Sequence, residues 1–136
     1  MEIKQISKWV VITGTLFIWI VKFLVRPFFE LDEPARFFFN IMPNLAGSFL
    51  IPFGACWFFY GRNSWVAKIF SIRSSYDLRM VCLIGFIMLV VNEYLQQIPV
   101  FGRTFDYFDI IFSFFGLLLS YFVYSRLQLR YDRSFN

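Results

Sequence analysis

The chain has 136 residues, of which 59% are hydrophobic and 24% aromatic, and its formal net charge is +4. This apolar share exceeds that of an ordinary soluble domain, and the lack of histidine excludes histidine-dependent zinc, protease and lipid-phosphatase chemistry. We therefore expect one all-α integral membrane domain that covers residues 1–136.

Four segments have the character of membrane-spanning helices, each of which needs roughly 20 mostly apolar residues. They cover approximately residues 9–25, 41–60, 80–98 and 105–125. Lys4 and Lys8 precede the first segment, as in a secretory signal, but its apolar run is too long and no small-residue cleavage site follows. We expect a retained helix there, and a membrane-spanning four-helix bundle overall.

The orientation follows from the basic residues, because Lys and Arg near helix ends are retained in the cytoplasm. Four spans place both termini on one side, which holds most of the 13 basic residues: Lys4, Lys8, Arg62, Lys68, Arg73, Arg79, Arg126, Arg130 and Arg133. Lys22, Arg26, Arg36 and Arg103 fall on the opposite side. We therefore expect both termini in the cytoplasm. Basic residues at helix ends also favour anionic lipid headgroups, so the positive charge indicates membrane lipids as partners and no nucleic acid.

Residues 26–44 connect the first two helices, alternate aromatic with charged residues and contain three prolines. This composition favours an amphipathic segment lying on the outer membrane surface, with a substrate-gripping loop as the alternative. In the second helix, Pro52 lacks a backbone N–H and predicts a kink. Cys56 and Cys82 lie inside apolar spans, where thiols behave as small hydrophobes, so no disulfide is expected.

A polar cluster follows the third helix, and its candidate site residues are Glu93, Gln97, Arg103, Asp106 and Asp109. Gln96 and Gln97 share a helical face with Glu93. Asp106 and Asp109 are three residues apart at the start of the fourth helix, so they are stacked roughly 4.5 Å apart along its axis. The connector joins the outer ends of the third and fourth helices, and these charges are therefore expected to meet near the outer membrane boundary.

Each charge also has a purely structural interpretation. Asp106 can cap the fourth helix while Asp109 lies in its first turn, and Arg103 can pair with either. Glu93 is harder to explain this way, because an ionisable group inside a membrane costs a few kcal/mol unless it finds water or a partner. The carboxylates could bind a divalent cation of unknown identity, or Arg103 could bind a phosphate. No cofactor is indicated.

Small residues predict where helices pack closely. Ser113, Gly116 and Ser120 form a stripe along the fourth helix, and Pro52 and Gly54 belong to the same group of packing residues in the second helix. Ser113 has no potential base other than Asp109, so we expect no covalent catalysis and no enzyme activity.

The polar pattern resembles that of VanZ-like membrane proteins, whose hallmark is a Glu, a nearby Gln, then Arg, Asp and Asp before a small-residue helix. The matching residues here are Glu93, Gln97 (or Gln96), Arg103, Asp106 and Asp109, followed by Gly116, and Pro52, Phe53 and Gly54 are similar to the family's Pro-Phe-Gly element. Three positions depart from the pattern: Ser113 and Ser120 stand where the family often has Asn and Gly, and Ala46 occupies the place of an asparagine, with Asn44 two residues early.

The resemblance implies a four-helix domain in the bacterial cytoplasmic membrane, in a family linked to resistance to the glycopeptide teicoplanin. The expected function is a non-enzymatic envelope protein whose outer polar site contacts lipid headgroups or a lipid-linked cell-wall precursor. The alternative is a small accessory subunit of a larger membrane complex, in which the small-residue stripe and the aromatic outer segment pack on other chains. A third hypothesis makes Glu93 and Asp109 the carriers of protons or cations in an enzyme or ion pathway.

Overall fold

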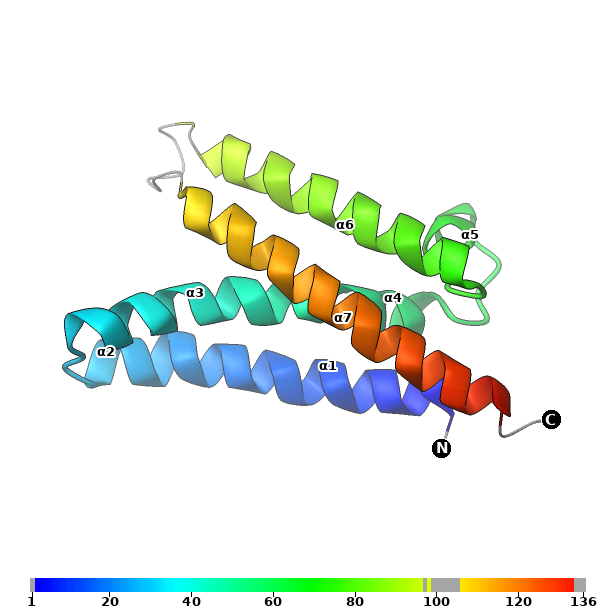
Figure 1. Ribbon diagram of the computed structural model, residues 1–136, viewed down its shortest axis with the longest axis horizontal. Helices are drawn as coiled ribbons and strands as arrows, with labels where there is room; N and C mark the ends of the chain where they lie inside the picture. The colour runs from blue at the N-terminus through cyan, green and yellow to red at the C-terminus, as the bar shows by residue number, and fades with distance from the viewer. Residues whose placement is uncertain (1, 97, 99–105, 134–136) are drawn as a thin grey trace.

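The structure is a computed structural model that describes residues 2–96, 98 and 106–133. All regular elements in these residues are helical, and four helices are long and apolar enough to cross a membrane: Ile3–Phe28, Glu33–Phe59, Ser75–Gln96 and Tyr107–Asp132. The start of the first helix and the end of the fourth lie at the same end of the bundle (Figure 1). The expected all-α, four-helix architecture is confirmed, while the side of the membrane that holds the termini stays a prediction.

The first long helix consists of α1 (Ile3–Ile20), a short π-helical stretch η1 (Val21–Val25) and α2 (Arg26–Phe28). The π-helix ends at Val25, two residues before Pro27. Proline cannot donate the hydrogen bond that a regular α-helix requires, and a wider turn at such a point preserves the continuity of the helix. The first helix therefore extends beyond the predicted range at both ends.

The second long helix consists of α3 (Glu33–Phe49) and α4 (Ile51–Phe59). Only residues 29–32 lie outside a helix between α2 and α3, so the expectation of a surface segment over residues 26–44 is wrong. Pro34 explains part of this difference, because it lies in the first turn of α3, where its missing N–H costs no hydrogen bond. The kink predicted at Pro52 is present as an interruption at Leu50, since Pro52 cannot donate to the Ser48 carbonyl.

The second half of the chain contains the short helix α5 (Trp65–Phe70) and the long helices α6 (Ser75–Gln96) and α7 (Tyr107–Arg133). Ser74 and Asp77 form a capping box at the start of α6: the Ser74 Oγ accepts a hydrogen bond from the Asp77 N–H, and the Asp77 Oδ2 accepts hydrogen bonds of 3.0 Å from the N–H groups of Arg73 and Ser74. Helix α7 continues eight residues past the predicted end of the fourth span at residue 125. Its main packing partner is α3, and it also packs against α6.

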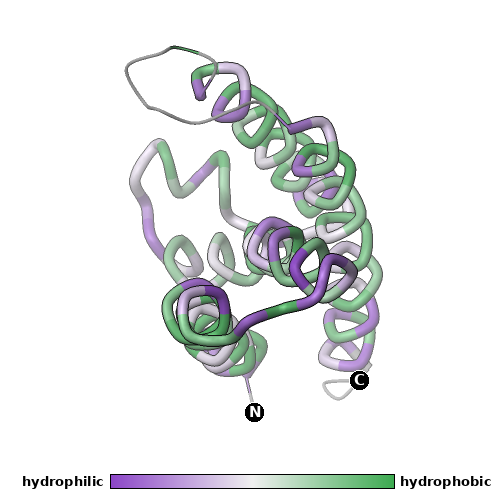
Figure 2. Tube along the Cα trace, turned by 90° about the vertical axis from the view of Figure 1, so that its left-hand side faces the viewer, coloured by the Kyte–Doolittle hydropathy of each residue, from purple (hydrophilic) through white to green (hydrophobic). Residues whose placement is uncertain are grey.

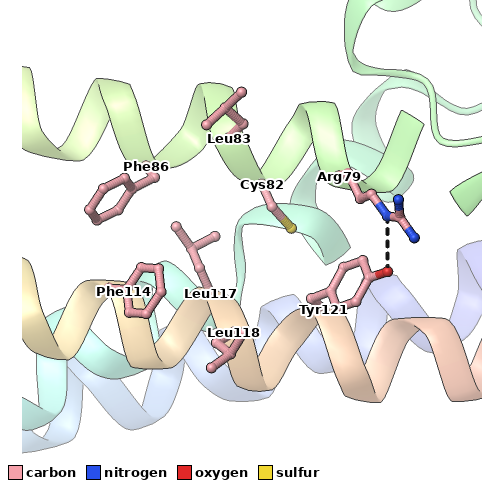
Figure 3. Close-up of a pocket in the computed structure, with 8 residues that line it drawn as sticks. All are labelled: Arg79, Cys82, Leu83, Phe86, Phe114, Leu117, Leu118 and Tyr121. Carbon is pink, nitrogen blue, oxygen red and sulfur yellow. Dashed lines mark hydrogen bonds between the residues drawn. The ribbon is translucent and has the colours of Figure 1, made fainter. Parts of the chain in front are cut away.

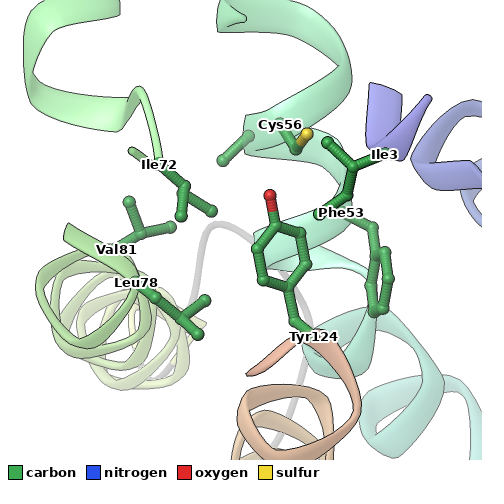
Figure 4. Packing of buried hydrophobic residues seen from close by; sticks show 8 residues of the cluster. Ile3, Phe53, Cys56, Ile72, Leu78, Val81 and Tyr124 are labelled. Carbon is green, nitrogen blue, oxygen red and sulfur yellow. The ribbon is translucent and has the colours of Figure 1, made fainter. Parts of the chain in front are cut away.

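The apolar core lies at the end of the bundle that holds the termini. It joins α1, α4, α6, α7 and the residues after α5, and its members are Ile3, Phe53, Ala55, Cys56, Ile72, Leu78, Val81 and Tyr124 (Figure 4). The rings of Phe53 and Tyr124 meet edge to face with centroids 5.4 Å apart, and the Tyr124 hydroxyl forms a hydrogen bond with Cys56. Cys56 and Cys82 are both free, as expected.

Large apolar side chains also cover the outside of the bundle. Trp19, Phe23, Ile87, Phe115 and Phe122 each expose about half of their surface or more. Exposed apolar area on this scale would be a liability in water, but it is the normal surface of a helix that faces lipid hydrocarbon. The distribution agrees with a multi-pass membrane protein.

Candidate functional site

Glu93, Asp106 and Asp109, the predicted site residues that the structure describes, lie at the end of the bundle opposite the termini. Here α2 and α6 end, and α3 and α7 begin (Figure 1). Figure 2 views the bundle from this end, and hydrophilic residues mark the connection between α2 and α3. The apolar core therefore lies at the end of the bundle that holds the termini, and the polar side chains lie at the opposite end.

Glu93 is buried, with 8% of its surface exposed, and it belongs to a helix long and apolar enough to cross a membrane. It lines a cavity of about 160 Å³ together with Asn44 and Ser48 of α3, Gln96 of α6 and Ser113 of α7. Three helices thus supply hydrogen-bonding groups to one small space. An ionisable side chain in a membrane segment requires such polar neighbours or water, so this cavity is the environment that makes Glu93 tolerable.

Asp109 is connected to the same cavity through Asn44. The Asn44 side chain forms a hydrogen bond with the Asp109 carboxylate, and Arg26 lies close enough to attract that carboxylate electrostatically. Asn44 also lines the cavity beside Glu93. Asn44 of α3 therefore interacts with the Asp109 carboxylate and also borders the cavity that contains Glu93.

Asp106 has a local structural role. It is the residue before α7, and its Oδ1 accepts a hydrogen bond of 2.9 Å from the N–H of Phe108. A carboxylate that accepts from the second helical N–H is an N-cap and stabilises the helix by about 1 kcal/mol. The capping interpretation of Asp106 is therefore present in the structure, with Asp109 in the first turn.

The described carboxylates can be checked for grouping with other potential metal ligands. Among residues 2–96, 98 and 106–133, no three His, Cys, Asp or Glu side chains form a group that could hold a metal ion. Glu93, Asp106 and Asp109 all belong to these described residues, and the divalent-cation hypothesis stays a prediction. Gln97 and Arg103, the other two predicted site residues, lie outside the described residues.

The stripe of Ser113, Gly116 and Ser120 faces α3 of the same chain. All three residues are buried. A Cβ atom added to Gly116 would collide with the Ser48 Oγ atom and the Leu45 carbonyl oxygen of α3, so only glycine permits this approach. Because the stripe is occupied within the chain, it offers no surface to another subunit.

Ser120 contacts the interruption between α3 and α4. Its Oγ donates a hydrogen bond of 2.6 Å to the carbonyl oxygen of Phe49, next to the turn that Pro52 imposes. Pro52 is fully buried there. Gly54 behaves differently, because a Cβ atom added to it would meet no atom within 4 Å. Pro52 is therefore buried inside the bundle, whereas the Cβ position of Gly54 has no close neighbour.

A second pocket adjoins this site and is lined by basic residues. It has a volume of about 550 Å³, and its walls include Lys22, Arg26 and Arg36 together with Asn40. Arg26 contributes both to this pocket and to the electrostatic environment of Asp109. The sequence predicts that these three basic residues lie on the outer side of the membrane but assigns none of them to a site. Their spacing was the available signal, since Lys22 and Arg26, like Arg36 and Asn40, are four residues apart and so share a helical face.

Asn44 is a further residue of this region that the sequence does not predict as part of the site. It is out of register with the asparagine of VanZ-like proteins, yet its side chain interacts with Asp109 and lines the cavity that contains Glu93. Asn44 and Ser48, four residues apart, form a polar pair on one face of α3.

Comparisons with models of known protein families, with curated proteins and with solved structures found no match to the chain. The resemblance to VanZ-like proteins stays a prediction from the polar motif.

Proposed function

We propose that the chain is a VanZ-like, non-enzymatic protein of the bacterial cytoplasmic membrane that binds the headgroup of a lipid or of a lipid-linked cell-wall intermediate. Both termini lie in the cytoplasm, and the binding site is at the outer end of the bundle. The shared chemistry of these ligands is a phosphate group attached to a hydrocarbon chain, with hydroxyl or amine groups nearby.

The observation that carries this proposal is the position of Arg26. Its side chain lines the basic pocket with Lys22 and Arg36 and also interacts with Asp109 beside the Glu93 cavity. Guanidinium and ammonium groups bind phosphate, whereas the amides and carboxylates suit hydroxyl and amine groups as hydrogen-bond acceptors or donors. The basic pocket therefore suits the phosphate of such a headgroup, and the neighbouring amides and carboxylates suit its hydroxyl or amine groups.

The test is extraction of the protein from its native membrane in a mild detergent, followed by native mass spectrometry of bound molecules. We expect a phosphate-containing lipid at fixed stoichiometry, lost in Arg26→Gln and in Arg103→Ala. Arg62→Gln is the control, since Arg62 is exposed and lies between α4 and α5. Equal loss in the control, or recovery of the wild type without any lipid, contradicts the proposal.

One observation supports the alternative function, an accessory subunit of a larger membrane complex. Phe28 and Phe29 expose 77% and 64% of their surfaces at the end of the first helix, and aromatic side chains are common in protein interfaces. Recovery with companion proteins at fixed stoichiometry, and without a bound lipid, would favour that function.

A further inference from the structure

A second ligand-sized space lies between α6 and α7, away from the polar site. It is a groove of about 430 Å³ whose walls are almost entirely apolar, with Leu83 of α6 and Leu118 of α7 on opposite sides (Figure 3). Leu83 exposes 53% of its surface and Leu118 exposes 40%. The groove is therefore accessible from the hydrocarbon that surrounds the bundle.

Two pairs of residues define the ends of the groove. At one end, the rings of Phe86 and Phe114 meet nearly perpendicular to each other, with centroids 5.6 Å apart. At the other end, the Arg79 Nε donates a hydrogen bond of 3.2 Å to the Tyr121 hydroxyl (Figure 3). Seven residues separate Arg79 from Phe86 along α6, which corresponds to about 10 Å. This length covers most of one leaflet, whose hydrocarbon is about half of the 30 Å bilayer core.

The guanidinium of Arg79 is available to an anion. Within the described residues it interacts with the Tyr121 hydroxyl and with no carboxylate. Asp77 is the nearest acidic residue in the sequence, and its Oδ2 accepts hydrogen bonds from the backbone N–H groups of Arg73 and Ser74. Tyr121 engages Nε alone, so the N–H groups of the two terminal nitrogens remain as donors, and these suit the oxygen atoms of a phosphate.

We propose that this groove binds one acyl chain of an anionic phospholipid whose phosphate is held by Arg79. Tyr121 is a positioning residue, because it holds the guanidinium at the mouth of the groove. The site lies near the start of α6, whereas Glu93 lies near its end, so the inference is independent of the headgroup site proposed above.

The test uses the full chain, delipidated in a mild detergent and titrated with phosphatidylglycerol or with phosphatidylcholine carrying the same acyl chains. Native mass spectrometry measures the fraction of protein with one bound lipid. One basic residue near an anionic headgroup corresponds to a preference of about fivefold for phosphatidylglycerol. Arg79→Gln should abolish this preference. Arg130→Gln, which removes an exposed charge from the same end of the bundle, should retain it.

A second pair of variants tests the groove itself. Leu83→Trp places a large ring in the groove and should reduce phosphatidylglycerol binding at least fivefold. Ile87→Trp is the matched control, since Ile87 lies one turn further along α6, is exposed to 52% and does not line the groove. The proposal is overturned if both tryptophan variants bind lipid like the wild type, or if Arg130→Gln loses the preference as completely as Arg79→Gln.

Discussion

Gly116→Ala tests whether close approach of α3 and α7 stabilises the bundle. The new Cβ atom would overlap the Ser48 Oγ and the Leu45 carbonyl oxygen, and the Leu45 carbonyl carbon would lie 3.1 Å away. Two of these atoms belong to the backbone of α3, which cannot yield by a side-chain rotation, so the helices must separate. Overpacking of this kind typically costs about 1–3 kcal/mol.

Gly54→Ala provides the matched control, because Gly54 is also helical but a Cβ atom there meets no atom within 4 Å. Both substitutions gain the same helix propensity, about 0.5–1 kcal/mol, so the difference between the two variants isolates the packing cost. We expect Gly116→Ala to have a free energy of unfolding about 1–3 kcal/mol below that of Gly54→Ala. The assay is reversible unfolding in mixed detergent micelles, followed by circular dichroism. Equal free energies for the two variants would refute the argument.

Three further predictions concern hydrogen bonds and topology. Ser120→Ala loses the hydrogen bond to the Phe49 carbonyl and should lower the free energy of unfolding by about 1 kcal/mol. Ser125→Ala is the control and should not show this loss, because the buried Ser125 Oγ makes no hydrogen bond within the described residues. Asn44→Ala removes the amide that interacts with Asp109 and should lower the free energy of unfolding by about 1–2 kcal/mol. An unchanged free energy of unfolding would contradict a stabilising interaction between Asn44 and Asp109. A reporter enzyme that is active only outside the cytoplasm should be inactive when fused after Asn136 and active when inserted after Leu31; the reverse pattern would invert the proposed orientation.

The existence of the four helices could be predicted from the sequence because it depends on local composition. Long apolar runs have no stable alternative to a helix within a membrane. The helix ends were less predictable where they depend on proline geometry. The sequence favours an amphipathic surface segment around Pro34, but in the first turn of α3 this proline is compatible with a helix, and the second span begins eight residues before the predicted start at residue 41.

The candidate site was only partly predictable, because its residues come together through the packing of separate helices. The motif between α6 and α7 identified Glu93 and Asp109 as neighbours of one polar region. It could not identify Asn44, since the register of α3 against α7 depends on the fit between Gly116 and the Leu45 carbonyl. Nor could the motif identify the pocket of Lys22 and Arg36, because these two residues come together only through the packing of the first helix against α3.

The small-residue stripe and the polar site are parts of one arrangement of α3 and α7. Asp109 and Gly116 are seven residues apart on α7, about 10 Å along the axis, and on α3 Asn44 is four residues from Ser48. The contact that requires glycine is therefore one to two turns from the hydrogen bond between Asn44 and Asp109. If a Cβ atom at Gly116 separates the two helices, this hydrogen bond must lengthen as well. Gly116→Ala should consequently weaken headgroup binding even in detergent conditions where the bundle remains folded, whereas Gly54→Ala should leave it unchanged. Loss of stability without any loss of binding would show that the site is held together by local contacts instead of by the stripe.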